Sequence, residues 1–146
     1  MEPGRGCCRP RYRGAVELAF VPYEGVDSVE DLVAPLTAAE VFTEAERRHC
    51  AARPSLERWA GRLAAKRAVL ASLGDRAAPL REVEVIPGPH EGEALPHLCA
   101  LGHRPVVRLS GSAAATAARL HVAGVELSIS HGDGMAVALA VGRPQS

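Results

Sequence analysis

A single long amphipathic helix over residues 55–74 is the feature that most constrains the fold of this chain. Ser55 is a good N-cap residue, and Gly74 is a good residue to follow the last helical turn. Steps of 3.6 residues from Leu56 define an apolar stripe that also includes Arg67, where a charge is costly unless it is paired. The sequence therefore predicts that Arg67 has an acidic partner.

Composition limits what can cover that stripe. The chain has 146 residues and a mass of 15.3 kDa, which favours one domain. Hydrophobic residues make up 47% of the sequence but aromatic residues only 3%, so we expect a core of Ala, Val and Leu. We expect the domain to span residues 14–142, with a flexible tail at 1–13 and a short tail at 143–146.

Charge and cysteine usage exclude several classes of protein. The formal net charge is zero, which argues against a general nucleic-acid binder. No apolar run reaches the roughly 18 residues of a membrane span, and residues 1–10 lack an apolar signal region, so we expect a cytoplasmic protein without a membrane partner. The cysteines favour reduced thiols, and one loop cluster matches no common zinc spacing: His90, His97, Cys99 and His103.

The remaining pattern predicts a mixture of helices and antiparallel strands. An apolar run over 15–23, interrupted by Glu17, indicates a buried strand, followed by short helical stretches near 30–40 and from Thr43. Glu46 lies three residues after Thr43, which is the spacing of a capping box. After the long helix we expect a strand at 80–86, a loop at 87–103, a strand at 105–109, a helix at 112–121 and a hairpin with strands at 125–130 and 135–141.

Basic residues draw attention to the middle of the long helix. Of the 17 basic residues 16 are Arg, and the one Lys is Lys66. Each candidate residue has a local explanation: Asp27 as a turn or cap residue, Arg62 and Lys66 as a solvated helix edge, and His131 as a turn residue. Taken together, a carboxylate, grouped cations and a Ser-His pair indicate phosphate chemistry.

The order of these motifs resembles the 4′-phosphopantetheinyl transferase superfamily, in particular the short holo-acyl-carrier-protein synthase type. Five motifs carry the resemblance over about residues 14–142: Gly25-Val26-Asp27, Phe42-Thr43-Glu44-Ala45-Glu46, Arg62-Leu63-Ala64-Ala65-Lys66-Arg67-Ala68, the segment 102–109, and Ser128-Ile129-Ser130-His131 before Ala136-Val137-Ala138. The resemblance implies an α+β fold of one domain, with an antiparallel sheet packed on a long central helix.

The resemblance also implies a function. Such enzymes transfer 4′-phosphopantetheine from coenzyme A to a serine of an acyl carrier protein, in fatty-acid or polyketide biosynthesis. They use Mg²⁺ and are typically homotrimers with sites between subunits. The resemblance implies catalytic roles for Asp27, Lys66, Arg67 and His131. It implies substrate contacts for Arg62, Ser130, Glu46 and Pro105.

Two departures separate this chain from the family pattern. Arg67 stands where the family has a metal-binding Glu, which leaves Asp27 as a weak metal ligand by itself, so we expect the Mg²⁺ site to be lost and an Asp27–Arg67 ion pair to replace it. The segment 30–36 is acidic and contains Pro35, where family members carry arginines that dock the carrier protein.

The departures leave three hypotheses open. The chain is a working transferase in which Arg62 or Arg67 holds the diphosphate. Alternatively, the fold is reused for cyclisation or elimination on a carrier-linked or coenzyme A-linked substrate, with Asp27 and His131 as acid and base. In the third hypothesis the chain is a non-catalytic homologue.

Overall fold

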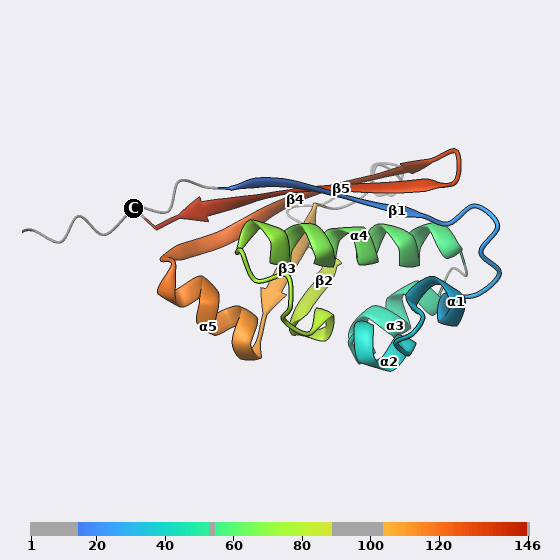
Figure 1. The fold of residues 1–146 in the computed structure, drawn as a ribbon, viewed down its shortest axis with the longest axis horizontal. Coiled ribbons are helices and arrows are strands. Elements are labelled where there is room, and N and C mark those ends of the chain that lie inside the picture. The colour runs from blue at the N-terminus through green and yellow to red at the C-terminus, as the bar shows by residue number, and fades with distance from the viewer. Residues whose placement is uncertain (1–14, 53–54, 89–103, 146) are drawn as a thin grey trace, which may run out of the picture.

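The computed structural model describes residues 15–52, 55–88 and 104–145. The elements in chain order are β1 (Val16–Pro22), α1 (Val29–Val33), α2 (Ala38–Val41), α3 (Glu44–Ala51), α4 (Leu56–Ser72), the 3₁₀ turn η1 (Leu80–Glu82), β2 (Val83–Pro87), β3 (Pro105–Leu109), α5 (Gly111–Arg119), β4 (Val122–Gly132) and β5 (Met135–Pro144). Figure 1 shows α4 lying along one face of a sheet, with α1, α2 and α3 clustered near one end and α5 at the other. The predicted α+β architecture is confirmed.

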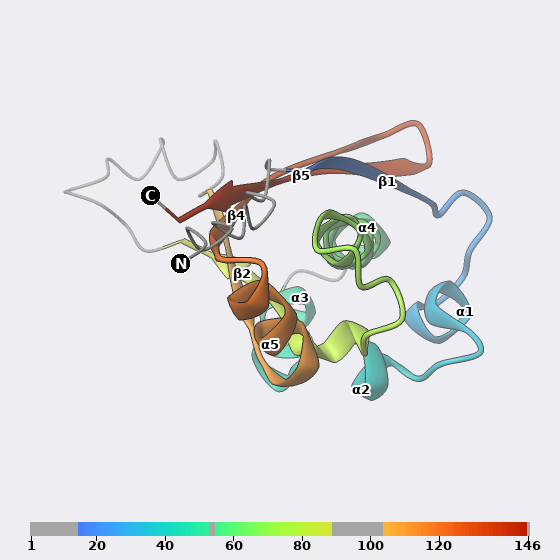
Figure 2. The ribbon, with the colours of Figure 1, turned by 60° about the vertical axis from the view of Figure 1, so that its left-hand side comes forward.

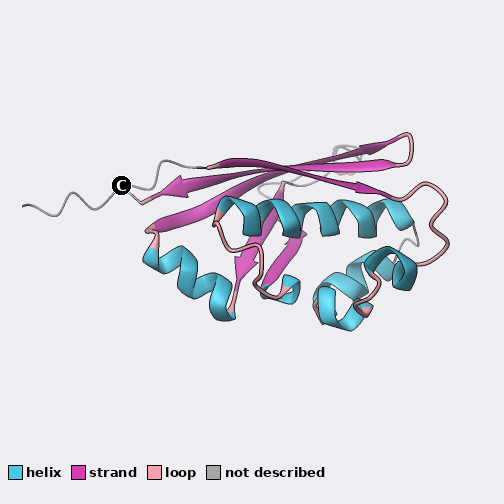
Figure 3. Ribbon diagram, viewed as in Figure 1, coloured by secondary structure: helices cyan, strands magenta, loops and turns pink. Residues whose placement is uncertain are grey.

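Two antiparallel sheets flank the central helix. The larger sheet has the order β1-β5-β4, and the smaller one pairs β2 with β3 (Figure 3). Viewed nearly along its axis in Figure 2, α4 lies beneath the larger sheet with β2 on another side. The predicted hairpin is confirmed, and Asp133 and Gly134 at its turn have φ of 51° and 77°, the left-handed values that a tight two-residue turn requires. Strand β5 runs to Pro144, two residues beyond the domain boundary that we expected.

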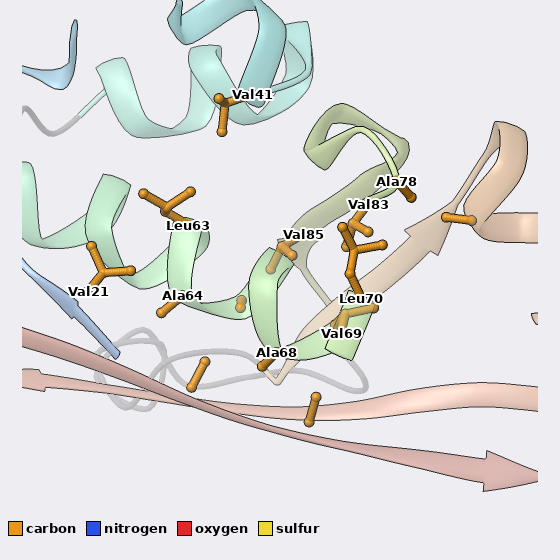
Figure 4. Packing of buried hydrophobic residues seen from close by; sticks show 14 of the residues in the cluster. Val21, Val41, Leu63, Ala64, Ala68, Val69, Leu70, Ala78, Val83 and Val85 are labelled. Carbon is orange, nitrogen blue, oxygen red and sulfur yellow. The ribbon is translucent and has the colours of Figure 1, made fainter. Parts of the chain in front are cut away.

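Small residues allow α4 to lie close to the sheet. Five of its eleven buried residues are alanines, and the facing side of β5 carries Ala136, Ala138 and Ala140, all fully buried. A Cβ on Gly61 would lie 3.0 Å from Ile129 Cγ2, so this position favours glycine. Figure 4 shows Ala64 and Ala68 of α4 directed toward the sheet, whereas Leu63 points toward the α2–α3 side. The expected Ala, Val and Leu core is confirmed.

The end of α4 follows the predicted pattern closely. Gly74 has φ +67°, its N–H donates to the carbonyl of Ala71, and the N–H of Asp75 donates to the carbonyl of Leu70. These two bonds form a Schellman cap, which satisfies carbonyls that the last turn leaves without partners. At the other end Ser55 occupies the N-cap position, but its side chain makes no capping hydrogen bond.

Other predicted elements differ in detail from those observed. The segment expected as one strand over 80–86 begins as the η1 turn, and pairing with β3 starts at Val83. The strand expected to be buried, β1, is buried on one side only: Val16, Leu18 and Phe20 are 61%, 53% and 58% exposed. Apart from Glu17 the run is apolar, because its outward side is also apolar. No helix in the described part of the chain has the length and apolar character needed to cross a membrane.

Candidate functional site

Lys66 lies inside the protein, and its ammonium group is fully hydrogen-bonded. It is 0% exposed, and Nζ donates to Glu46 Oε1 at 2.5 Å, to the carbonyl of Leu80 at 3.3 Å and to the carbonyl of Val83. An ammonium group has three donors, so none remains for a phosphate. Burial lowers the pKa of Lys66, and the Glu46 carboxylate opposes that shift. The expectation that Lys66 contacts phosphate is therefore at odds with this structure.

Glu46 is buried at the same place and is likewise occupied. Its Oε1 accepts the N–H of Thr43 at 2.9 Å, which completes the predicted capping box of α3, and its Oε2 accepts the N–H of Val85 at 3.0 Å. The Thr43 hydroxyl donates to Glu84 at 2.6 Å. Glu46 thus joins α3, α4 and β2, and its expected substrate contact is replaced by a structural role. We call Glu46, Lys66 and their hydrogen-bond partners the buried polar cluster.

The predicted ion pair between Asp27 and Arg67 is wrong for this structure. Both residues are described, both are exposed, and no ion pair joins them. Asp27 lies in the loop between β1 and α1, whereas Arg67 is the one exposed residue among positions 60–72 of α4. Other elements pack against α4 on several sides, so most of the helix surface is buried. Arg67 lies on the narrow strip that remains open to solvent, not at the centre of the apolar stripe.

The residues present do not fit the Mg²⁺ ion that the resemblance implies. Magnesium is held by carboxylates and water in near-octahedral geometry. The family pattern has carboxylates at two positions. This chain has a carboxylate at the first, Asp27, and a positive charge at the second, Arg67. Within the described residues no group of three or more His, Cys, Asp and Glu side chains could hold a metal ion. The loop cluster His90, His97, Cys99 and His103 lies outside the described residues.

A groove beside α4 brings together three of the predicted residues: Arg62, Pro105 and His131. Residues of α3, α4, β2, β3, β4 and β5 line it. Arg62 Nε donates to the carbonyl of Val85 at 3.2 Å, which fixes its guanidinium against β2. Ser130 is not part of the lining; it is exposed on β4 and pairs with Val137. We call this depression the basic groove.

The charge of the basic groove was not foreseen from the sequence. Six of its lining residues can be cationic, namely His49, Arg58, Arg62, Arg104, His131 and Arg143. Glu126 is the one acidic residue lining it in the part of the chain that the structure describes, and its Oε1 lies 3.7 Å from Arg143 Nε. The spacing of Arg58, four residues before Arg62, was the available signal, since such residues share one side of a helix. No such sequence signal was available for Arg104 and Arg143, because strand pairing brings these two residues to the groove.

The groove charges affect a neighbouring imidazole. Burial lowers the pKa of His49, and the positive charges of Arg62 and Arg58 lower it further. The other imidazole that lines the groove is that of His131, whose Nδ1 lies 3.2 Å from Glu57 Oε2, and both side chains are about half exposed. The arrangement can bind a ligand with several negative charges, and arginine forks suit phosphate oxygens particularly well.

Comparison with known proteins shows which family has this fold and these motifs. No protein-family model matches the chain. It is 42% identical over 104 residues to the holo-[acyl-carrier-protein] synthase of Desulforudis audaxviator, covering 69% of this chain and 70% of that protein. It is also 42% identical over 107 residues to the enzyme of the same name from Frankia alni, covering 73% of this chain and 78% of that protein.

Solved structures agree with these relatives. A structure described as the Chronobacterium ammoniagenes ACPS–CoA complex is 29% identical, with a TM-score of 0.67 over 91% of this chain and 98% of that one. The holo-ACP-synthase of Plasmodium yoelii has the same fold at 18% identity, with a TM-score of 0.68 over 90% of this chain and 94% of that one. The chain belongs to the holo-[acyl-carrier-protein] synthase family.

Proposed function

We propose that this protein transfers the 4′-phosphopantetheine group from coenzyme A to a serine of an acyl carrier protein. In this reaction the serine oxygen forms a bond to the phosphorus that carries the pantetheine arm. The bond from that phosphorus to the bridging oxygen of the diphosphate breaks, 3′,5′-ADP leaves, and the serine proton is released. The chemistry requires positioning of the two reactants and neutralisation of phosphate charge.

The observation that carries the proposal is the charge of the basic groove. The chain as a whole is neutral, yet this groove gathers four arginines and two histidines around one acid that faces Arg143. Coenzyme A carries a diphosphate and a 3′-phosphate, so its charge is complementary to the groove. The apolar residues Val85, Val107 and Ile129, which also line the groove, suit the uncharged pantetheine arm.

The proposed transferase does not depend on a resident Mg²⁺ ion. Because the donor set around Asp27 and Arg67 does not fit that ion, the guanidinium groups of this chain must balance the phosphate charge. Arg62 is held in the groove by its bond to the carbonyl of Val85, which reduces the freedom it must lose when a ligand binds.

A second candidate function is favoured by the same charge reversal at Arg67. The groove would then bind a coenzyme A-linked or carrier-linked substrate and support cyclisation or elimination rather than transfer. His131 lines the groove but Asp27 does not. An acid–base pair of Asp27 and His131 therefore has less support than a catalytic role for His131 alone.

We also propose that the protein is a homotrimer whose subunits pack through the outward face of the larger sheet. On that face the exposed Leu18 and Phe20 of β1 are paired with Leu139 and Val137 of β5, which makes a continuous apolar surface. Exposed apolar patches of this kind mark protein interfaces. Light scattering should give a trimer mass for the parent and a lower mass for Leu18→Glu. Leu36→Glu, exposed to a similar extent outside this face, is the control and should remain a trimer.

Mass spectrometry of a carrier protein tests the proposed transfer directly. The protein is incubated with coenzyme A and several apo carrier proteins, once with Mg²⁺ and once with EDTA. We expect the carrier to gain the mass of one phosphopantetheine group in both conditions. Binding of coenzyme A without any gain would favour the second candidate function, and absence of both would indicate a non-catalytic homologue. A gain in Mg²⁺ alone would contradict metal independence.

A further inference from the structure

His131 is held from one side by Glu57. Glu57 lies in the first turn of α4, and His131 lies near the end of β4, 74 positions later in the chain. The Nδ1–Oε2 distance of 3.2 Å joins the two elements at the edge of the basic groove. Glu57 itself is not among the groove-lining residues, so its carboxylate approaches the imidazole from outside the groove.

This contact determines which imidazole nitrogen a ligand can meet. A proton on Nδ1 is shared with Glu57, so Nε2 is the nitrogen that remains available to the groove. In the protonated imidazole Nε2 is a donor, as a phosphate oxygen requires. Arg58 and Arg62 of α4 line the same groove as His131. Burial, Glu57 and Asp133 of the hairpin turn raise the pKa of the neighbouring Tyr23 hydroxyl.

We infer that Glu57 is a positioning residue for the binding of coenzyme A. It fixes the orientation of the His131 ring through Nδ1, so that Nε2–H of the protonated imidazole faces the phosphate groups of the ligand. The inference rests on the proposed function, because it takes coenzyme A as the ligand of the groove. It assigns a role to Glu57, which matches none of the motifs that carry the family resemblance.

Two variants of Glu57 separate positioning from folding. In Glu57→Gln the amide oxygen still accepts the Nδ1 proton, whereas Glu57→Ala removes the acceptor. We expect Glu57→Ala to weaken the affinity for coenzyme A about fivefold and Glu57→Gln to retain most of it. Glu44→Ala is the matched control, because Glu44 is also an exposed acid in the first turn of a helix and pairs with Arg48. It should leave affinity unchanged.

Nitrogen-15 NMR of the imidazole reports which ring nitrogen carries the proton. A purely structural role of Glu57 would leave that position unchanged. In the parent we expect the neutral form of His131 to carry its proton on Nδ1, and in Glu57→Ala we expect a mixture of tautomers. His131→Gln keeps a donor near the position of Nε2. In that background Glu57→Ala should cause no further loss of affinity, since the residue through which Glu57 acts is gone.

Each outcome bears on a different claim. If the parent binds coenzyme A and Glu57→Ala changes neither affinity nor tautomer, the positioning role is wrong while the proposed function stands. Equal losses from Glu57→Ala with and without His131 would also overturn it, because Glu57 would then act by another route. If the parent does not bind coenzyme A at all, both proposals fail.

Discussion

Helix α4 places basic side chains in two opposite surroundings. In the buried polar cluster Lys66 is shielded from water, and its charge is balanced by Glu46 and by backbone carbonyls. In the basic groove Arg58 and Arg62 face an open depression with few acids. The first arrangement uses its charge to join elements of the fold, whereas the second leaves its charge available to a ligand. Basic residues on one helix can therefore serve stability or binding, according to what packs against each side.

Removing the charge of Lys66 should have the largest effect on stability. Lys66→Met leaves the Glu46 carboxylate buried without its partner, so we expect a loss of about 3–5 kcal/mol in the free energy of unfolding. Chemical denaturation measures this loss. The double variant Lys66→Met/Glu46→Gln should recover part of it, because no buried charge remains. Loss of less than about 1 kcal/mol in the single variant would show that the pair is not shielded as described.

The same kind of change in the groove should affect binding rather than stability. Arg62→Ala removes a guanidinium that lines the basic groove, so we expect affinity for coenzyme A to fall about tenfold or more. The free energy of unfolding should change by about 1 kcal/mol or less, since only one hydrogen bond to Val85 is lost. Calorimetry and denaturation on one sample measure both quantities. A large stability loss with unchanged affinity would reverse the contrast between the two regions.

A smaller effect should come from His49 and depend on pH. Its pKa lies below the ordinary 6.5 because of burial and the nearby arginines. Between the lowered pKa and 6.5 the unfolded chain binds more protons, so the stability contributed by neutral His49 is lost as pH falls through this window. A bound polyanion offsets the arginine charges and raises the pKa, so binding should take up protons near pH 6. Calorimetry in buffers of different ionisation enthalpy measures this uptake, which should decrease in His49→Gln.

Arg67 should give the smallest change in stability, because it belongs to neither region. It is exposed and without an ion pair, so Arg67→Glu should alter the free energy of unfolding by about 0.5 kcal/mol or less. The substitution restores the second carboxylate of the family pattern, of which Asp27 is the first. We therefore expect a saturable rise in thermal stability with Mg²⁺ in the variant and none in the parent. A Mg²⁺ response in the parent would contradict the lost metal site, and transferase activity found only in the variant would favour the second candidate function.

Local patterns in the sequence determined much of this fold. The Thr43–Glu46 capping box, the glycine after α4 and the two-residue hairpin turn each depend on interactions within a few residues. Such interactions depend little on the rest of the structure, so their positions agree with expectation. The α+β architecture followed from the alternation of these elements and from the family resemblance.

The tertiary structure alone decided the direction of each basic side chain. Lys66 and Arg67 are neighbours on a helix covered on several sides, so periodicity could not tell which of them faced the narrow opening to solvent. The basic groove likewise combines residues from α3, α4 and the strands, which only chain pairing brings together. Helical periodicity specifies the directions of side chains around the helix axis. Packing against elements far away in the sequence decides which direction is buried, which faces solvent and which faces a ligand.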